Sequence, residues 1–217
     1  MRRLCSRGSE RNYLMFDRIQ TIDIKMLRMI QRNFRCSLFD AVMPYISLVG
    51  NVGAVWATVM VVFFLMPHYR EAGVVMFFVL AACGVLTNFV LKPLVARPRP
   101  CHTYPDQKLL VNRPTDYSFP SGHTMSSFGA ALIIFHANHA LGIVAFTFAF
   151  LMAFSRLYLF VHYPSDVLTG VVLGLSAASE PLVLVFAALC ACVYCGKTRY
   201  RRGEEETTAG VGESGNG

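Results

Sequence analysis

Long uncharged runs alternate with short polar stretches along this chain. No residue carries a formal charge from Ala41 to Tyr69, from Ala72 to Leu91, or from Tyr117 to Ser155. Over such lengths, a helix of a water-soluble protein presents charged residues to solvent. Charges are costly in hydrocarbon, so their absence predicts helices that cross a membrane.

The apolar runs and the residues that break them predict an all-α integral-membrane bundle of five or six spans. The expected helices cover residues 38–66, bent by Pro44 and the patch from Gly50 to Gly53, and then 72–95, 121–136, 140–160 and 164–195. The last range is one long helix or two short ones, because Glu180-Pro181 lies in its interior and proline disrupts a helix.

The stretch from about Asn12 to Arg35 is amphipathic and basic. Cations recur there at helical spacing against an apolar face; they are Arg18, Lys25, Arg28, Arg32 and Arg35, facing Met15, Ile19, Ile22, Met26, Met29 and Ile30. This pattern predicts a helix lying in the membrane interface, with its cations toward anionic headgroups. A soluble helix packed on the rest of the domain is the alternative.

These features divide the chain into three parts. Residues 1–37 form a basic interfacial segment, residues 38–196 form the membrane domain, and residues 197–217 form a polar tail that we expect to be disordered. The net charge is +7, which first suggests nucleic acid as a partner. Because the basic residues lie at membrane edges and in the polar stretches, we expect a membrane lipid instead, and no nucleic acid.

Three of the polar stretches, called islands below, carry the candidate chemistry. Island one is Lys92–Pro100, island two is Pro120–His123 and island three is Ser155–Asp166. Island one ends the second expected span, and island two opens the third after a loop. The third and fourth spans then cross and return, so all three islands are expected on one side of the membrane.

Island three contains a histidine and a carboxylate four residues apart. Pro164 suits the first turn of the helix that begins there, which puts Asp166 within one turn of His162. The carboxylate can then accept a hydrogen bond from His162, fix its tautomer and leave the other ring nitrogen as a nucleophile. His123 could protonate the leaving oxygen and later deprotonate water.

The other polar residues of the islands suit an oxyanion. Ser121 favours a helix N-cap and Gly122 lets backbone approach a ligand, while helix N-terminal N–H groups attract anions. The three cations Lys92, Arg99 and Arg156 could stabilise charge on a transferring phosphoryl group. Each feature alone has a commoner explanation, such as a lone cation reaching the interface. Together they predict cleavage of a phosphate bond, in a lipid.

The three islands, in this order, resemble the signature of the type-2 phosphatidic-acid phosphatase superfamily, over roughly Leu91 to Gly170. The resemblance implies that His162 becomes a phosphohistidine, that Asp166 orients it and that His123 acts as acid and base. It implies that the phosphate is held by Lys92, Arg99, Ser121, Gly122 and Arg156. It also implies that the enzyme needs no metal or other cofactor.

The resemblance leaves the substrate open. Compact bacterial members include undecaprenyl-diphosphate phosphatases, and Arg97, Lys108 and Arg113 could serve a second phosphate, so undecaprenyl diphosphate is the first expectation. Phosphatidylglycerophosphate and phosphatidic acid are the alternatives. A vanadate-dependent haloperoxidase shares the signature but is soluble and much longer. A non-catalytic membrane protein would tolerate loss of the two histidines and the carboxylate.

The face of the membrane is a further open question. The positive-inside rule puts the Arg-rich N-terminal stretch, and with it the islands, in the cytoplasm. The bacterial members of the family instead place the site outside the cytoplasmic membrane. The C-terminal cations Lys197, Arg199, Arg201 and Arg202 agree with an outside site if 164–195 crosses once. We therefore expect a multi-pass cell-membrane protein with an extracytoplasmic site.

Overall fold

The computed structural model describes residues 2–50 and 53–179, with side chains from residue 18 onward. Within these ranges the chain is helical and contains no strand, as the uncharged runs predict. The expected break at Glu180-Pro181 and the tail at 197–217 lie outside the described residues.

The N-terminal helix α1 (Arg2–Asn33) contacts the ends of α8 and α9. Its described part has three faces. Asp23, Ile24, Leu27 and Ile30 are buried against the bundle. The cations from Arg18 to Arg32 are exposed, and so are Ile19, Ile22, Met26 and Met29. The structure thus has a helix over this stretch, longer than the expected range, and its place in the membrane interface stays a prediction.

The first apolar run forms a bent pair of helices. Helix α2 (Ser37–Val49) is followed by α3 (Ala54–Leu65), and their axes differ by 52°. The bend falls at the glycine patch, as expected, because Gly53 adopts a left-handed backbone at φ 69°.

The second apolar run extends from a short 3₁₀ turn, η2 (Pro67–Tyr69), through α4 (Arg70–Val85). It continues as one π-helical segment, η3 (Leu86–Leu91), and ends in α5 (Lys92–Val95). Ala96 then takes a left-handed conformation, φ 48°, which turns the chain into the polar loop that carries the short helix α6 (Pro100–Thr103). Lys92 and Arg99 thus lie on opposite sides of a sharp reversal.

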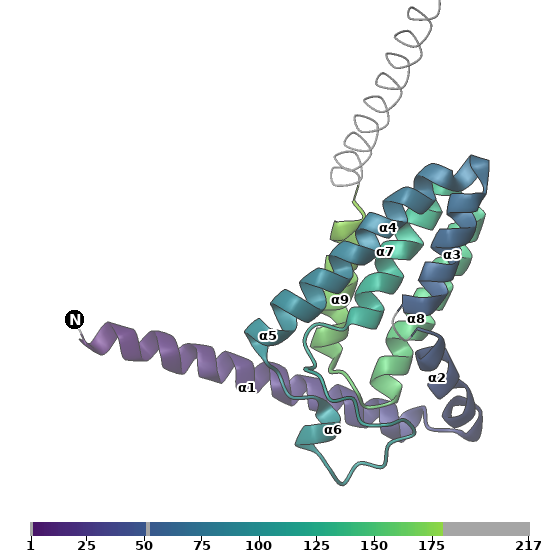
Figure 1. Ribbon diagram of the computed structural model, residues 1–217. Coiled ribbons are helices and arrows are strands. Elements are labelled where there is room, and N and C mark those ends of the chain that lie inside the picture. Colours follow the sequence, from purple (N-terminus) through teal and green to yellow (C-terminus); the bar gives the residue numbers. More distant parts are fainter. Residues whose placement is uncertain (1, 51–52, 180–217) are drawn as a thin grey trace, which may run out of the picture. The chain divides into compact units, whose positions relative to one another are not determined.

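Three further helices complete the described bundle, and α7 lies among its neighbours (Figure 1). Helix α7 (Gly122–Ala137) packs against α4, α8 (His139–Tyr158) and α9 (Pro164–Ala177). Most of α7 is buried, whereas α8 and α9 expose large apolar side chains, including Val144, Phe150 and Leu168. An apolar exterior around a packed interior is what a bilayer requires.

Two described helical segments are long and apolar enough to cross a membrane, and a third is obtained if the bent pair is one span. The two are Pro67–Thr103 and His139–Tyr158. Helices α7 and α9 have 16 and 14 residues, which is short for a span of about 20 residues. The chain is thus a helical membrane protein, and the number of five or six spans stays a prediction.

Candidate active site

The three islands meet at one cavity of about 1230 Å³. The polar residues that they contribute to its wall are Lys92, Arg99, Gly122, His123, Arg156 and His162. Apolar residues of α2, α3 and α4 line it as well, among them Leu48, Met60 and Phe77. A cavity with both kinds of wall can hold an anionic group attached to an apolar chain.

His162 is buried, and both of its ring nitrogens have partners. Nδ1 lies 2.7 Å from the carbonyl oxygen of Ser118, and Nε2 lies 2.9 Å from Nη1 of Arg99. A carbonyl only accepts and a guanidinium only donates, so Nδ1 carries the proton and the Nε2 lone pair faces Arg99. Burial, followed by the charges of Arg99 and Arg156, lowers the pKa of His162 well below its usual value.

Asp166 does not make the expected direct hydrogen bond to His162. Its Oδ2 is 3.7 Å from Nδ1, and it accepts hydrogen bonds from Ser118 Oγ at 2.5 Å and from the Tyr163 N–H at 2.9 Å. The other oxygen, Oδ1, accepts from Arg97 at 2.6 Å. The carboxylate therefore reaches the imidazole through Ser118, whose carbonyl accepts the hydrogen bond that the sequence assigned to Asp166.

Two of the three cations share a carboxylate that was not predicted. Asp116 accepts from Lys92 Nζ at 2.5 Å and from Arg99 Nη2 at 2.7 Å. Burial alone would raise the pKa of Asp116, but the hydrogen bond from Lys92 and the charge of Arg99 outweigh it and lower the pKa to about 2. The pair of cations is thus neutralised in part by the loop that covers it.

Arg156 is 5% exposed and carries a buried donor without a protein partner. Its Nη1 donates to Ser47 Oγ, whereas its Nε has no hydrogen-bond partner among the described residues. An unpaired buried N–H is rare, because it has lost water without gaining an acceptor. At the wall of a cavity such a donor favours an anionic ligand.

Some residues of island two line the cavity, and others are buried behind it. Gly122 and His123 line the cavity. Ser121 is the residue before α7, as expected of an N-cap, but its side chain is fully buried and pairs with Thr124 Oγ1 at 2.9 Å. Ser121 is not part of the cavity wall, so the structure brings seven of the eight expected residues to the cavity or to His162 and leaves Ser121 behind them.

Of the three extra cations, Arg113 alone lines the cavity, where its Nη2 also bonds the Pro105 carbonyl at 2.6 Å. Lys108 is exposed and outside the wall. Arg97 donates to Asp166 and to Asp23, at 2.6 and 2.7 Å, and lies outside the wall too. Its two Nη nitrogens already bond four protein acceptors, so the structure does not support a role for Arg97 at a second phosphate.

The sequence did not predict three residues of this site, Ser118, Asp116 and Asp23. Ser118 acts through its backbone carbonyl, which leaves no mark in a sequence. Asp116 is an ordinary acidic residue of a polar loop until the fold brings it between two cations.

The fold and the cavity define the class of this protein as a membrane-embedded phosphate hydrolase. Buried arginines, a neutral histidine and an unpaired guanidinium donor gather at one cavity within a helical membrane bundle. Comparison with known proteins agrees and gives the family. The chain belongs to the PAP2 superfamily, whose family model matches residues 72–190.

Similar proteins come from bacteria and archaea. The undecaprenyl-diphosphatase of Sulfolobus acidocaldarius is 30% identical over 155 residues, which cover 70% of this chain and 73% of that protein. The crystal structure of Aquifex aeolicus LpxE superposes with a TM-score of 0.64 and 27% identity, covering 72% of this chain and 92% of that one.

A second solved structure is the PAP2-type phosphatidylglycerolphosphate phosphatase of Bacillus subtilis. It has a TM-score of 0.61 and 28% identity, covering 77% of this chain and 85% of that one. These relatives support a phosphatase over a haloperoxidase or a non-catalytic membrane protein.

Proposed function

We propose that this protein hydrolyses a lipid phosphate or diphosphate, without a metal, through a phosphohistidine formed on His162. The observation that carries the proposal is the state of His162. Its Nδ1–H is held by the Ser118 carbonyl, and its Nε2 lone pair lies beside Arg99 at the cavity wall. A buried neutral imidazole with one nitrogen fixed is a nucleophile at neutral pH.

The reaction takes two displacements. Nε2 of His162 attacks phosphorus as the bond from phosphorus to the lipid oxygen breaks, and His123 gives its proton to that oxygen. Neutral His123 then takes a proton from water, which attacks phosphorus, breaks the phosphorus–nitrogen bond and releases inorganic phosphate. Lys92, Arg99 and Arg156 offset the charge on the phosphoryl oxygens, and the Gly122 backbone permits their close approach.

The proposed roles of Asp166 and Ser121 are indirect. Asp166 orients His162 through Ser118 and balances the positive charge that the imidazole acquires on phosphorylation. Ser121 supports the phosphate site from behind, as the residue that precedes α7 and donates its N–H to the Asp166 carbonyl at 3.1 Å.

Undecaprenyl diphosphate is our first choice of substrate. The archaeal relative is an undecaprenyl-diphosphatase, and Arg113 at the cavity wall could meet a second phosphate. Phosphatidylglycerophosphate is the alternative, supported by the Bacillus subtilis relative, with phosphatidic acid beside it. Phosphate release from these three lipids, compared under one detergent condition, distinguishes the choices.

For the membrane we propose five crossings in the cell membrane, made by the pair α2–α3 and by α4, α7, α8 and α9. This order returns the chain to one face at Lys92, Gly122 and His162. We infer that this face is extracytoplasmic and that α1 lies in its interface. The exposed apolar stripe of α1 beside its exposed cations supports the interfacial position.

The test of the proposed chemistry is phosphate release by detergent-solubilised protein in the presence of EDTA. His162→Ala and His123→Ala should each lower turnover by about 10³-fold or more, because each removes a group that forms or breaks a bond. Wild-type levels of activity in either variant, with the protein monodisperse, would refute the mechanism. Activity that EDTA abolishes would refute metal independence.

A further inference from the structure

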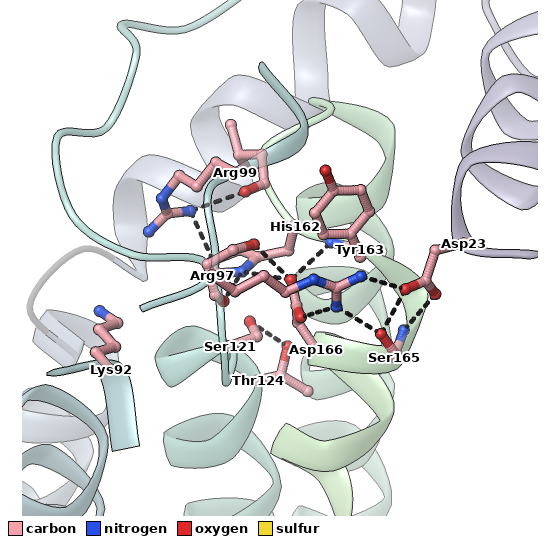
Figure 2. A network of polar contacts seen from close by, with 12 residues as sticks. Asp23, Lys92, Arg97, Arg99, Ser121, Thr124, His162, Tyr163, Ser165 and Asp166 are labelled. Atoms are coloured by element: carbon pink, nitrogen blue, oxygen red, sulfur yellow. Dashed lines mark hydrogen bonds and ion pairs between the residues drawn. The ribbon is translucent and has the colours of Figure 1, made fainter. Parts of the chain in front are cut away.

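Arg97 joins two helices that are far apart in the sequence. Its Nη2 donates to Gln20 and Asp23 of α1, at 2.6 and 2.7 Å, and its Nη1 donates to Ser165 and Asp166 of α9, at 2.7 and 2.6 Å. The guanidinium also lies over the ring of Tyr163, 3.9 Å from its centroid. Figure 2 shows Arg97 between Asp23, Ser165 and Asp166. None of the residues in these contacts belongs to the cavity wall.

Asp23 holds the start of α9 as well as Arg97. The carboxylate is 3% exposed, and its Oδ1 accepts the backbone N–H of Ser165 at 3.0 Å. Its Oδ2 accepts Ser165 Oγ at 2.6 Å and Arg97 at 2.7 Å. Asp23 thus caps α9 from another helix, where a negative charge is favoured by the free N–H groups of the first turn.

A continuous chain of hydrogen bonds leads from this cluster to the nucleophile. Arg97 fixes Oδ1 of Asp166, and Oδ2 of Asp166 accepts from Ser118 Oγ. The Arg97 carbonyl accepts the Ser118 N–H at 2.8 Å. Ser118 is therefore held at its nitrogen and its hydroxyl, and the carbonyl between these two points accepts the Nδ1–H of His162.

We propose that Asp23 and Arg97 are positioning residues for His162, so that the N-terminal helix contributes to catalysis without touching the substrate. This inference rests on the proposed function, because it assumes that His162 is the nucleophile. A buried carboxylate is costly unless all of its acceptors are used, and every described bond of Asp23 points to Arg97 or to the first turn of α9.

The geometry predicts which substitutions are disruptive. Arg97 bonds four acceptors with two planar nitrogens, a pattern that the single ammonium of lysine cannot match, so Arg97→Lys is not conservative here. Asp23→Asn keeps the shape but replaces an acceptor with a donor against Arg97 or Ser165. Both changes release Ser118 and loosen His162 without altering the cavity wall.

The matched control is Asp40→Asn. Asp40, like Asp23, pairs with an arginine and accepts from a hydroxyl: Arg35 lies at 3.6 Å and the Tyr158 hydroxyl donates at 2.6 Å. It has no described bond to the cluster around Arg97. Asp40→Asn therefore measures the effect of losing a carboxylate that is not linked to Ser118, and Asp23→Asn measures the effect of losing one that is.

The experiment measures kcat, KM and Tm for full-length protein in lipid-phosphate mixed micelles, with rapid-quench trapping of the acid-labile phosphoenzyme. Asp23→Asn and Arg97→Lys should each lower kcat and the phosphorylation rate by about 10- to 100-fold, as small misplacements of a reacting group do. KM should stay within about twofold of wild type, since substrate contacts remain. The double variant should lose no more than Arg97→Lys alone, because the two residues act in series.

Several outcomes would overturn the inference. They are a kcat for Asp23→Asn within about twofold of wild type, an equal loss in Asp40→Asn, or a rise in KM with kcat unchanged. If Asp23→Asn fails to fold, Ser165→Ala, which removes one hydroxyl from the cluster, should still lower kcat at constant KM; an unchanged kcat there would refute it. His162→Ala serves as the reference: activity in that variant refutes the proposed function itself.

Discussion

At the scale of single residues, Asp116 bonds two of the cations to which we assign the substrate phosphate. Its two oxygens hold Lys92 and Arg99, the cations proposed to bind phosphate. A phosphate that enters must compete with this carboxylate. Because the pKa of Asp116 is lowered to about 2, the carboxylate stays ionised throughout the range in which an enzyme is assayed.

Asp116→Asn should therefore strengthen inhibition by inorganic phosphate, by about fivefold, the equivalent of about 1 kcal/mol for a half-exposed ion pair. The gain should be the same at pH 5 and pH 8. Asp106→Asn, a change of the other carboxylate in this loop, is the control and should leave the inhibition constant unaltered. Weaker inhibition in Asp116→Asn would mean that the carboxylate organises the cations and does not compete.

The lowered pKa of Asp116 also affects how the stability of the fold depends on pH. The ion pairs of Asp116 stabilise the folded state at pH values above the ordinary carboxyl range, and this contribution disappears as pH falls from about 4 toward 2. Since the side chain is 46% exposed, solvent screens the pairs and the contribution is small.

His162 gives a second prediction for single residues. Its pKa lies well below 6.5 in the substrate-free protein, so its imidazole should not titrate between pH 8 and pH 6.5. NMR titration of the histidine ring signals, with His162→Asn to assign them, checks this. A midpoint at or above pH 6.5 would contradict the buried, neutral state. Stability should fall as pH drops below 6.5, because the unfolded chain then binds the proton more readily.

The sequence predicted those parts of the candidate site that depend on which residue types occur at which spacing along the chain. His123, His162 and the cations come together as the islands indicate. The direct bond from Asp166 to His162 was a wrong expectation, because spacing along a helix start does not reveal that a backbone carbonyl lies between them. No sequence pattern connects Asp23 to His162, since their link passes through three residues on separate elements.

At the scale of elements, the site depends on how closely α7 and α9 approach. A methyl group at Gly174 would lie 2.3 Å from the carbonyl oxygen of Met125, and one at Gly170 would lie 2.8 Å from that of Ser121. Two glycines four residues apart thus let the backbones touch, as small residues do between helices in membranes. Helix α7 carries His123 and α9 carries Asp166, so this contact sets the distance between them.

Gly174→Ala should push α9 from α7, lower stability by about 1–3 kcal/mol through overpacking, and reduce kcat. Thermal unfolding in detergent and phosphate release measure the two effects. Gly84→Ala is the matched control for stability, because a methyl group at this helical position meets nothing within 4 Å. If both variants have the Tm of wild type, the close contact is not needed for the fold.

The elements were predictable where charge is absent over long runs. Helices α3 and α7 fall within these runs, and most of α4 and α8 does, because a helix in hydrocarbon must avoid charge. Helix α4 begins with two charged residues before its run, Arg70 and Glu71, and α8 extends past its run to Arg156 and Tyr158. The π-helical segment Leu86–Leu91 and the reversal at Ala96 were not predicted. In both places the backbone changes direction or hydrogen-bond pattern while the general character of the side chains stays the same. Hydrophobic periodicity therefore cannot predict them.

At the scale of the whole molecule, the face of the membrane decides which pool of lipid the enzyme meets. In the proposed topology, α1 shares its face with the cavity, and five crossings put the C-terminal tail on the opposite face. The basic residues from Lys197 to Arg202 favour the cytoplasm for that tail under the positive-inside rule.

Single cysteines at Ser9 and Gly212, introduced after the native cysteines are replaced by serine, test this arrangement in intact cells. An impermeant maleimide should label Ser9→Cys directly and Gly212→Cys only after permeabilisation. The reverse pattern would put the cavity in the cytoplasm, and labelling of both from outside would refute an odd number of crossings.

The unpaired Nε of Arg156 bears on how the enzyme can select its lipid. Among the described residues this buried N–H has no acceptor, and an oxygen of a tetrahedral oxyanion could supply one. Substrate, free phosphate and vanadate each offer such an oxygen, so we expect the polar wall to recognise a phosphoryl group and not the molecule that carries it. We then expect discrimination among lipids to come from the apolar wall of α2, α3 and α4. We also expect inorganic phosphate, the product, to inhibit the enzyme, because it offers the polar wall the same oxygens as the substrate.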